Sequence, residues 1–213
     1  MTVRLLEQSW LRVRRLAERY PDEWGGEDLL GEDPLRVFAG ARDPRRVLVV
    51  SSEAALKRWD RSEWPAGLVV VVATGRVSKA QANIIGAIAA KSPLPIGFVG
   101  DASPMGLHTY LSLQGYLGAR RVRFCGVCDA VVRMLGRDVP SPEFLATREF
   151  SAFDRAHLRV VASLTRLEHV LGPRVAAVVG GGRAIPIASL SFRSGLMQVM
   201  FEVALSLASR RGR

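Results

Sequence analysis

The stretch GFVGDASPMGLHTYLSLQGYLGARRVRFCGV, residues 97–127, contains the pattern that decides the fold. An apolar run ends at Asp101, Pro104 follows, and a long helical pattern then leads to a second apolar run that begins near Val122. Proline is tolerated in the first turn of a helix, so we expect the helix to begin there. A strand, an acidic turn and a helix in this order place the acid at the mouth of an α/β sheet.

Similar apolar runs alternate with helical patterns from residue 45 onward. The four runs are RRVLVV (45–50), GLVVVVAT (67–74), LPIGFVGD (94–101) and RRVRFCGV (120–127). The helical patterns between them cover 52–59, 78–91 (with Ser78 as N-cap) and 104–117. Strands that are apolar throughout and alternate with helices indicate a parallel sheet with helices on both faces. The predicted fold class is therefore α/β, with a parallel sheet of about four strands.

Further helical patterns flank this core, over residues 1–20, 151–172 and 194–211. The first is amphipathic, with leucines on one side and most of its arginines on the other. The second has Ser151 as an expected N-cap and Gly172 as an expected terminator, and the last is apolar around most of its circumference. Between them, RVAAVVGGGRAIPIASLSF (174–192) predicts a strand or a short helix broken by three glycines.

These patterns give a division of the chain into three segments. Residues 1–44 are expected to hold an N-terminal helix and an acidic loop, and residues 45–130 the α/β core. Residues 131–213 are expected to form a helical extension that packs on the core. The acidic loop, PDEWGGEDLLGEDPLR (21–36), is interpreted as a lid, a partner contact or a linker.

The charge balance points to an anionic partner. The 213-residue chain has a net charge of +10, and only Lys57, Lys79 and Lys91 among its 30 basic residues are not arginine. Arginine binds phosphate bidentately, which favours a nucleic-acid partner. A GC-rich coding sequence would give the same arginine excess without any partner.

Composition argues against several classes of protein. No apolar run approaches the roughly 20 residues that a membrane-spanning helix needs, so we expect no membrane association. Glu7 and Glu18 make the N-terminal pattern unlike a secretory signal, so a cytoplasmic protein is expected, associated with the nucleoid if it binds DNA. Cys125 and Cys128 form a single CxxC, too few ligands for a zinc site, and are predicted to pack at a strand end in a reducing cytoplasm.

The ends of the predicted strands carry the candidate site residues, because ligands of parallel sheets bind beyond the carboxyl ends of the strands. Glu53 follows the first strand and Asp101 the third, so both are expected at one edge of the sheet. A carboxylate pair there is suited to Mg²⁺. Each acid also has a structural interpretation, since Glu53 lies in a first helical turn and Asp101 precedes a helix that it could cap.

Basic residues form the second part of the predicted site. Arg76, Ser78 and Lys79 lie at the start of the helix after the second strand, where the helix dipole favours phosphate. Arg120 and Arg121, before the fourth strand, complete the residues predicted to contact phosphate or DNA. The alternative is that these side chains are solvated. GGGR (180–183) has neither P-loop nor GxGxxG spacing and is predicted to be a turn.

The order strand–Glu53, strand–TGRVSKA (74–80), strand–GDASPMG (100–106), helix, strand resembles a Toprim domain. More narrowly, it is similar to the DNA topoisomerase VI A subunit and the related proteins that make meiotic double-strand breaks. That family carries a glutamate after the first strand and an aspartate-x-aspartate-proline-x-glycine motif after the third. The resemblance covers roughly residues 45–172, where SAFDRAHLRVVASL is similar to the family's helix after the Toprim core. It implies a magnesium site at Glu53, Asp101 and Ser103.

The sequence departs from the family pattern at several places. Ser103 stands where the family has the second aspartate of its motif, which removes a negative charge. RVAAVVGGGRAIPIASL contains no glutamate, although relatives usually carry glutamates in that region. The winged-helix domain with the family's DNA-cleaving tyrosine is not expected here, because Tyr20 lies in a short helix and Tyr110 and Tyr116 are expected to pack.

These departures favour a catalytically degenerate Toprim-like protein that is DNA-associated or an accessory subunit of a DNA-processing complex, and not an enzyme. One alternative is an active Mg²⁺-dependent phosphodiester-processing enzyme, a nuclease or nucleotidyl transferase, that uses Glu53 and Asp101. Another is a Rossmann-like nucleotide- or small-molecule-binding protein. The apolar stretch LMQVMFEVAL (196–205) predicts a protein partner or a homodimer.

Overall fold

The computed structural model describes residues 3–19, 35–39, 44–52, 56, 59, 64–136, 145–190 and 196–209. Its main sheet has five strands in the order β1-β3-β2-β4-β5. The strands are β1 (Arg36–Ala39), β2 (Arg46–Val50), β3 (Leu68–Val72), β4 (Ile96–Val99) and β5 (Val122–Phe124). The strands β2 to β5 are parallel and correspond to the four predicted apolar runs, so the α/β class is confirmed.

The fifth strand makes the sheet mixed and was not predicted. β1 pairs antiparallel with β3 and begins in the segment expected to be the acidic loop. It is a short edge strand in which Arg36 and Val37 are exposed and Phe38 is half-buried. A strand at the edge needs no long apolar run, and the run here covers only residues 37–39, shorter than those that identified the central strands.

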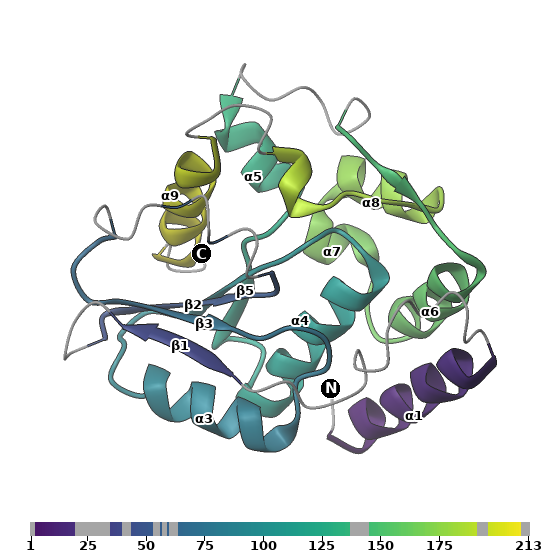
Figure 1. The fold of residues 1–213 in the computed structure, drawn as a ribbon, viewed down its shortest axis with the longest axis horizontal. Helices are drawn as coiled ribbons and strands as arrows, with labels where there is room; N and C mark the ends of the chain where they lie inside the picture. Colours follow the sequence, from purple (N-terminus) through teal and green to yellow (C-terminus); the bar gives the residue numbers. More distant parts are fainter. Residues whose placement is uncertain are drawn as a thin grey trace.

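Helices cover both faces of this sheet (Figure 1). α3 (Lys79–Ala89) and α4 (Pro104–Leu117) pack side by side on one face. α9 (Leu196–Ser209) packs on the other face against β4, with α5 (Asp129–Met134) beside it. The predicted helix over 52–59 lies mostly outside the described residues.

Local capping signals explain where α3 and α4 begin. Ser78 and Gln81 form a capping box, with each side chain accepting a hydrogen bond from the other residue's backbone N–H. Ser103 caps α4, and Pro104 occupies the first turn as predicted. Both starts were readable from the sequence because the caps are local.

The segment expected to be one helix over 151–172 is two. α6 (Ala152–Ala162) begins at the predicted cap Ser151, and α7 (Leu167–Leu171) ends at Gly172. Between them the regular helical ladder ends at the Val161 carbonyl, which accepts from the N–H groups of both Leu164 and Thr165. The next segment forms α8 (Pro173–Gly180), a turn at the glycines, β7 (Arg183–Ala184) and the 3-10 helix η5 (Ile187–Leu190); β7 pairs with β6 (Arg148–Glu149).

The C-terminal helix α9 buries most of its described apolar side chains within the chain. Phe201, Ala204 and Leu205 are buried, and the Phe201 ring stacks on Trp59 at 4.3 Å. Val199 is 44 % exposed. The predicted protein partner or homodimer at this helix stays a prediction. Among the described helices, none has the length and hydropathy to cross a membrane.

The two cysteines are buried near the end of β5. Both carry free thiols, as the packing interpretation predicted. Burial, and then the neighbouring Cys128, raise the pKa of Cys125 to about 12. A thiol held in its neutral form is a poor nucleophile, so these residues serve as packing groups.

The loops after β4 and β5 touch through their backbones at Gly100 and Gly126. Val127 donates its N–H to the Gly100 carbonyl at 3.0 Å. A Cβ added at Gly126 would lie 2.5 Å from the Gly100 nitrogen and closer still to its carbonyl oxygen. Only glycine fits at position 126, because a Cβ would clash with backbone atoms of Gly100, which cannot move aside as a flexible side chain could.

We therefore expect Gly126→Ala to lower the free energy of unfolding by at least about 2 kcal/mol, as overpacking does. Gly180→Ala is the matched control, because a Cβ there meets nothing within 4 Å, and it should change stability by less than about 1 kcal/mol. Urea unfolding measures both, and equal stability of the two variants would contradict the packing described.

The N-terminal helix α1 (Val3–Arg19) packs on α4 and α6 around a buried pair of histidines. Ser9 donates its hydroxyl to the Leu6 carbonyl and lies 2.7 Å from His108 Nε2, while His108 Nδ1 lies 3.0 Å from His157 Nε2. Trp10 stacks on His108 with ring centroids 3.9 Å apart. Because the Ser9 hydroxyl proton is used on the Leu6 carbonyl, the Ser9 oxygen must accept from His108 Nε2–H. His108 Nδ1 then carries no proton and accepts from His157 Nε2–H.

Both histidines are held neutral. Burial, followed by the His157 and Arg76 charges, keeps the pKa of His108 well below its usual range. Burial lowers the pKa of His157 to about 4, with a smaller opposing effect of Asp154. The remaining nitrogen, His157 Nδ1, is buried and has no hydrogen-bond partner in the described part of the chain.

This pair makes stability depend on pH in a defined window. Because the folded-state pKa lies below the value of about 6.5 for an exposed histidine, the stabilisation is complete above pH 6.5 and is lost as pH falls toward 4. The expected slope is about 1.4 kcal/mol per pH unit for each histidine. His157→Gln should reduce the slope of unfolding free energy against pH by about 1.4 kcal/mol per pH unit, because one fewer proton is taken up on unfolding. Urea unfolding at stepped pH measures the slope, and an unchanged slope would contradict the assignment.

Candidate ligand pocket at the carboxyl edge of the sheet

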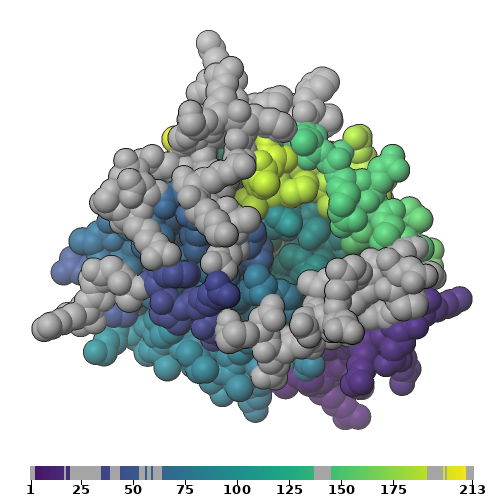
Figure 2. All heavy atoms as spheres, viewed as in Figure 1, coloured from purple at the N-terminus to yellow at the C-terminus, as the bar shows by residue number. Residues whose placement is uncertain are grey.

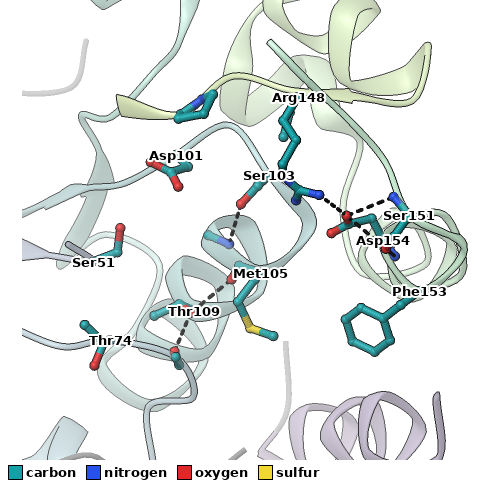
Figure 3. A pocket seen from close by; sticks show the side chains of 14 residues that line it. Ser51, Thr74, Asp101, Ser103, Met105, Thr109, Arg148, Ser151, Phe153 and Asp154 are labelled. Carbon is teal, nitrogen blue, oxygen red and sulfur yellow. Dashed lines mark hydrogen bonds and ion pairs between the residues drawn. The ribbon is translucent and has the colours of Figure 1, made fainter. Parts of the chain in front are cut away.

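The strand order creates a crevice where the ends of β2 and β4 lie next to each other. The chain leaves β2 toward β3 on one side and leaves β4 toward β5 on the other. Ligands of open α/β sheets bind at such a switch point. A pocket of about 460 Å³ lies here, with walls from the ends of β2, β3 and β4, the start of α4, and the segments around β6 and β7 (Figure 3).

Asp101 lies at the end of β4 and borders the pocket. Its Oδ1 accepts a hydrogen bond of 2.7 Å from the Ile187 N–H at the start of η5. Beside it, Ala102 and Ile185 exchange two backbone hydrogen bonds of 3.1 Å. Burial raises the pKa of Asp101, and the Ile187 N–H and the positive charge of Arg148 oppose that rise. Asp101 thus ties the C-terminal segment to the central sheet.

Ser103, the position that departs from the resembled motif, acts as the N-cap of α4. Its Oγ accepts a hydrogen bond of 3.1 Å from the Gly106 N–H. A Cβ on Gly106 would lie 2.5 Å from the Asp101 carbonyl oxygen, so the turn requires glycine there. The sequence Asp-x-Ser-Pro-x-Gly is therefore explained locally by a tight strand-to-helix turn.

Thr109 connects the turn after β3 to α4. Its hydroxyl contacts two carbonyl oxygens, that of Gly75 at 2.7 Å and that of Met105 at 3.0 Å. Gly75 has a φ of +63°, a conformation that other residues rarely adopt. Sequence analysis did not single out Thr109, because a threonine in a helix pattern carries no signal of a tertiary contact.

Arg148 supplies a positive charge at the pocket. Its guanidinium lies 2.7 Å from Asp154 Oδ2, and that hydrogen bond raises the pKa of Arg148. Asp154 also accepts from the backbone and hydroxyl of Ser151, which caps α6. Figure 3 shows Arg148 extending beside the pocket toward Asp154. Sequence analysis missed this pair, since Ser151 and Asp154 are readable only as a helix cap.

The predicted basic residues do not gather at this pocket. Arg76 turns toward α1, where it lies 3.2 Å from Glu7 and 5.7 Å from the Trp10 ring centroid. Ser78 serves in the capping box of α3, and Lys79 is exposed beside it.

Arg120 and Arg121 lie elsewhere. They are exposed before β5, at the amino edge of the sheet, and border a separate hollow. Of the predicted site residues that the structure describes, Asp101 and Ser103 alone border the pocket. Glu53 lies outside the described residues.

The donor set at the pocket does not fit a magnesium ion held by the described residues alone. Asp101 already accepts a hydrogen bond, Ser103 is a neutral cap, and Arg148 places a positive charge nearby. Mg²⁺ needs near-octahedral oxygen ligands and one or two free carboxylates. Within the described ranges no three His, Cys, Asp or Glu side chains cluster to hold a metal.

Comparison with known proteins gives no assignment. A scan of the chain against protein-family models found no match, and a search of the curated proteins found none either.

Proposed function

We propose that this protein is a catalytically degenerate, Toprim-like module that associates with DNA as an accessory subunit of a DNA-processing complex. The main support comes from the hydrogen bonds of the GDASPMG turn (residues 100–106). Its two polar side chains serve the fold, with Asp101 accepting from Ile187 and Ser103 capping α4. The turn resembles the metal motif of that family but lacks one of its two negative charges, since Ser103 replaces the second aspartate.

Two further features support this function. The turn lies at the switch point of a mostly parallel sheet, where an α/β domain binds its ligand. The net charge of +10, almost entirely arginine, favours phosphate-bearing partners. Arg148 offsets part of the negative charge of Asp101 and Asp154, which weakens attraction for a divalent cation.

The proposal predicts how the turn responds to a restored charge. Ser103→Asp should fold like the unmodified protein, because aspartate is as good an N-cap as serine. We expect this variant to gain weak, millimolar binding of Mg²⁺ or Mn²⁺ in calorimetry, whereas the unmodified protein shows none in that range. Ser103→Asn is the matched control, because it caps the helix and adds no charge.

The alternative of a Mg²⁺-dependent phosphodiester enzyme predicts different results. Saturable metal binding by the unmodified protein, abolished by Asp101→Asn and accompanied by cleavage of duplex DNA, would support that enzyme, with Glu53 and Asp101 as its ligands. Asp101→Asn keeps an oxygen that accepts from Ile187, so it tests the charge with little effect on the fold. The proposed module instead binds duplex DNA in chelator and cleaves none.

A second candidate function is supported by the pocket itself. A volume of about 460 Å³ lies in the range of small-molecule sites, and the walls combine Met105, Phe153 and Pro186 with hydroxyl groups. A Rossmann-like nucleotide- or small-molecule-binding protein would have this mixture. Nucleotides that raise the melting temperature, with no measurable binding of duplex DNA by the protein, would favour this second function.

A further inference from the structure

We propose that the solvent face of α1 is a docking surface for the phosphate backbone of duplex DNA. The inference deepens the proposed DNA association and rests on it. The surface is an arginine stripe, defined as Arg4, Arg12, Arg15 and Arg19, all four of which are exposed. α1 lies at the surface of the molecule, purple at the lower right of Figure 2.

Helix geometry gathers these arginines on one side. At about 100° per residue, positions 4, 12, 15 and 19 fall within a sector of about 80°, opposite the buried positions. The stripe is about 22 Å long, since its ends are fifteen residues apart. One DNA strand carries a phosphate every 3.4 Å or so along the duplex axis, so the stripe can meet several phosphates of one backbone.

Of the two acids of the helix, Glu7 lies away from the stripe, whereas Glu18 lies on its flank, three residues from Arg15. Glu7 contacts Arg76 at 3.2 Å and accepts a hydrogen bond of 2.5 Å from the Tyr116 hydroxyl. Glu18 pairs with Arg14 at 3.3 Å on the flank of the helix. The exposed arginines of α1 thus outnumber Glu18, the one exposed acid among the described residues of the helix, and the net charge of its solvent face is positive.

The helix dipole accounts for Arg19, a basic residue in the last turn of α1, but it does not account for Arg4. The positive end of the helix dipole favours acids in the first turn, yet α1 has none there and carries Arg4 instead. A residue placed against a local preference is expected where function requires it.

The buried face of α1 argues for a nucleic acid and against an anionic membrane. Interfacial helices insert a free apolar face into the bilayer. In α1 that face is occupied, since Leu6 and Trp10 are at most 2 % exposed and Trp10 donates to Ser112 on α4 at 3.0 Å. The exposed Leu5 and Leu11 lie on opposite flanks of the stripe and form no continuous apolar band.

The test compares two triple variants that remove equal charge. The stripe variant is Arg4→Gln, Arg12→Gln and Arg15→Gln, which keeps good helix formers on exposed positions. The control variant is Arg45→Gln, Arg133→Gln and Arg166→Gln, three exposed arginines outside α1 and outside the residues predicted to contact phosphate or DNA. Circular dichroism and urea unfolding verify that both variants fold like the unmodified chain.

Binding of a fluorescein-labelled random-sequence duplex is measured by anisotropy at stepped salt concentrations. We expect the stripe variant to bind at least about tenfold more weakly and its log–log salt slope to fall by about three, because three arginines no longer neutralise a phosphate. The control variant should keep most of its affinity and most of its salt slope.

The outcomes separate the inference from the proposed function. Duplex binding by the unmodified protein that both variants lose equally, or that neither loses, overturns the docking surface and leaves DNA association standing. No binding of duplex by the unmodified protein overturns both. Stripe-dependent binding of phosphatidylserine vesicles in place of DNA also overturns the proposal and assigns the surface to a membrane.

Discussion

The hydrogen bond between the Ile187 N–H and the Asp101 carboxylate holds the pocket together. Asp101 lies two residues after the end of β4, and η5 begins at Ile187, 86 residues later in the chain. With the Ala102–Ile185 bridge, this bond attaches the C-terminal segment to the edge of the sheet. Without it, the β6–β7 side of the pocket would have no polar side-chain attachment to β4 among the contacts described. Asp101 is half-buried, and the hydrogen bond from Ile187 offsets part of the cost of removing its carboxylate from water.

That attachment changes the meaning of the motif that singled out Asp101. The same turn that would present two carboxylates to a metal presents here one carboxylate bonded to backbone and one serine at a helix start. Gly106 is required because its backbone passes against that of Asp101. A strand-to-helix turn of this shape can attach two segments of the chain to each other or present ligands to a metal, and the two roles share a similar sequence pattern.

Much of the fold was predictable because its signals are local. Continuous apolar runs identified β2 to β5, and Ser78, Ser103 and Pro104 identified the starts of α3 and α4. β1 escaped because its apolar run covers only residues 37–39, and the break after α6 escaped because no glycine or proline marks it. The site was predicted only in part. Asp101 and Ser103 follow from the strand end, whereas Arg148 reaches the pocket through β6–β7 pairing, which no local pattern encodes.

The pocket has a consequence for the thermodynamics of the whole chain. Its walls come from segments near residues 51, 74, 101–109, 148–154 and 184–186, so the cavity exists only when sheet, α4, α6 and the C-terminal segment are all in place. A ligand that occupies it binds the native state and no partially folded one. Occupancy at a hundredfold excess over the dissociation constant then adds about 2.7 kcal/mol to the global unfolding free energy. The unfolding free energy of the whole chain therefore depends on ligand concentration. Resistance of distant segments to proteolysis should rise as the pocket is filled.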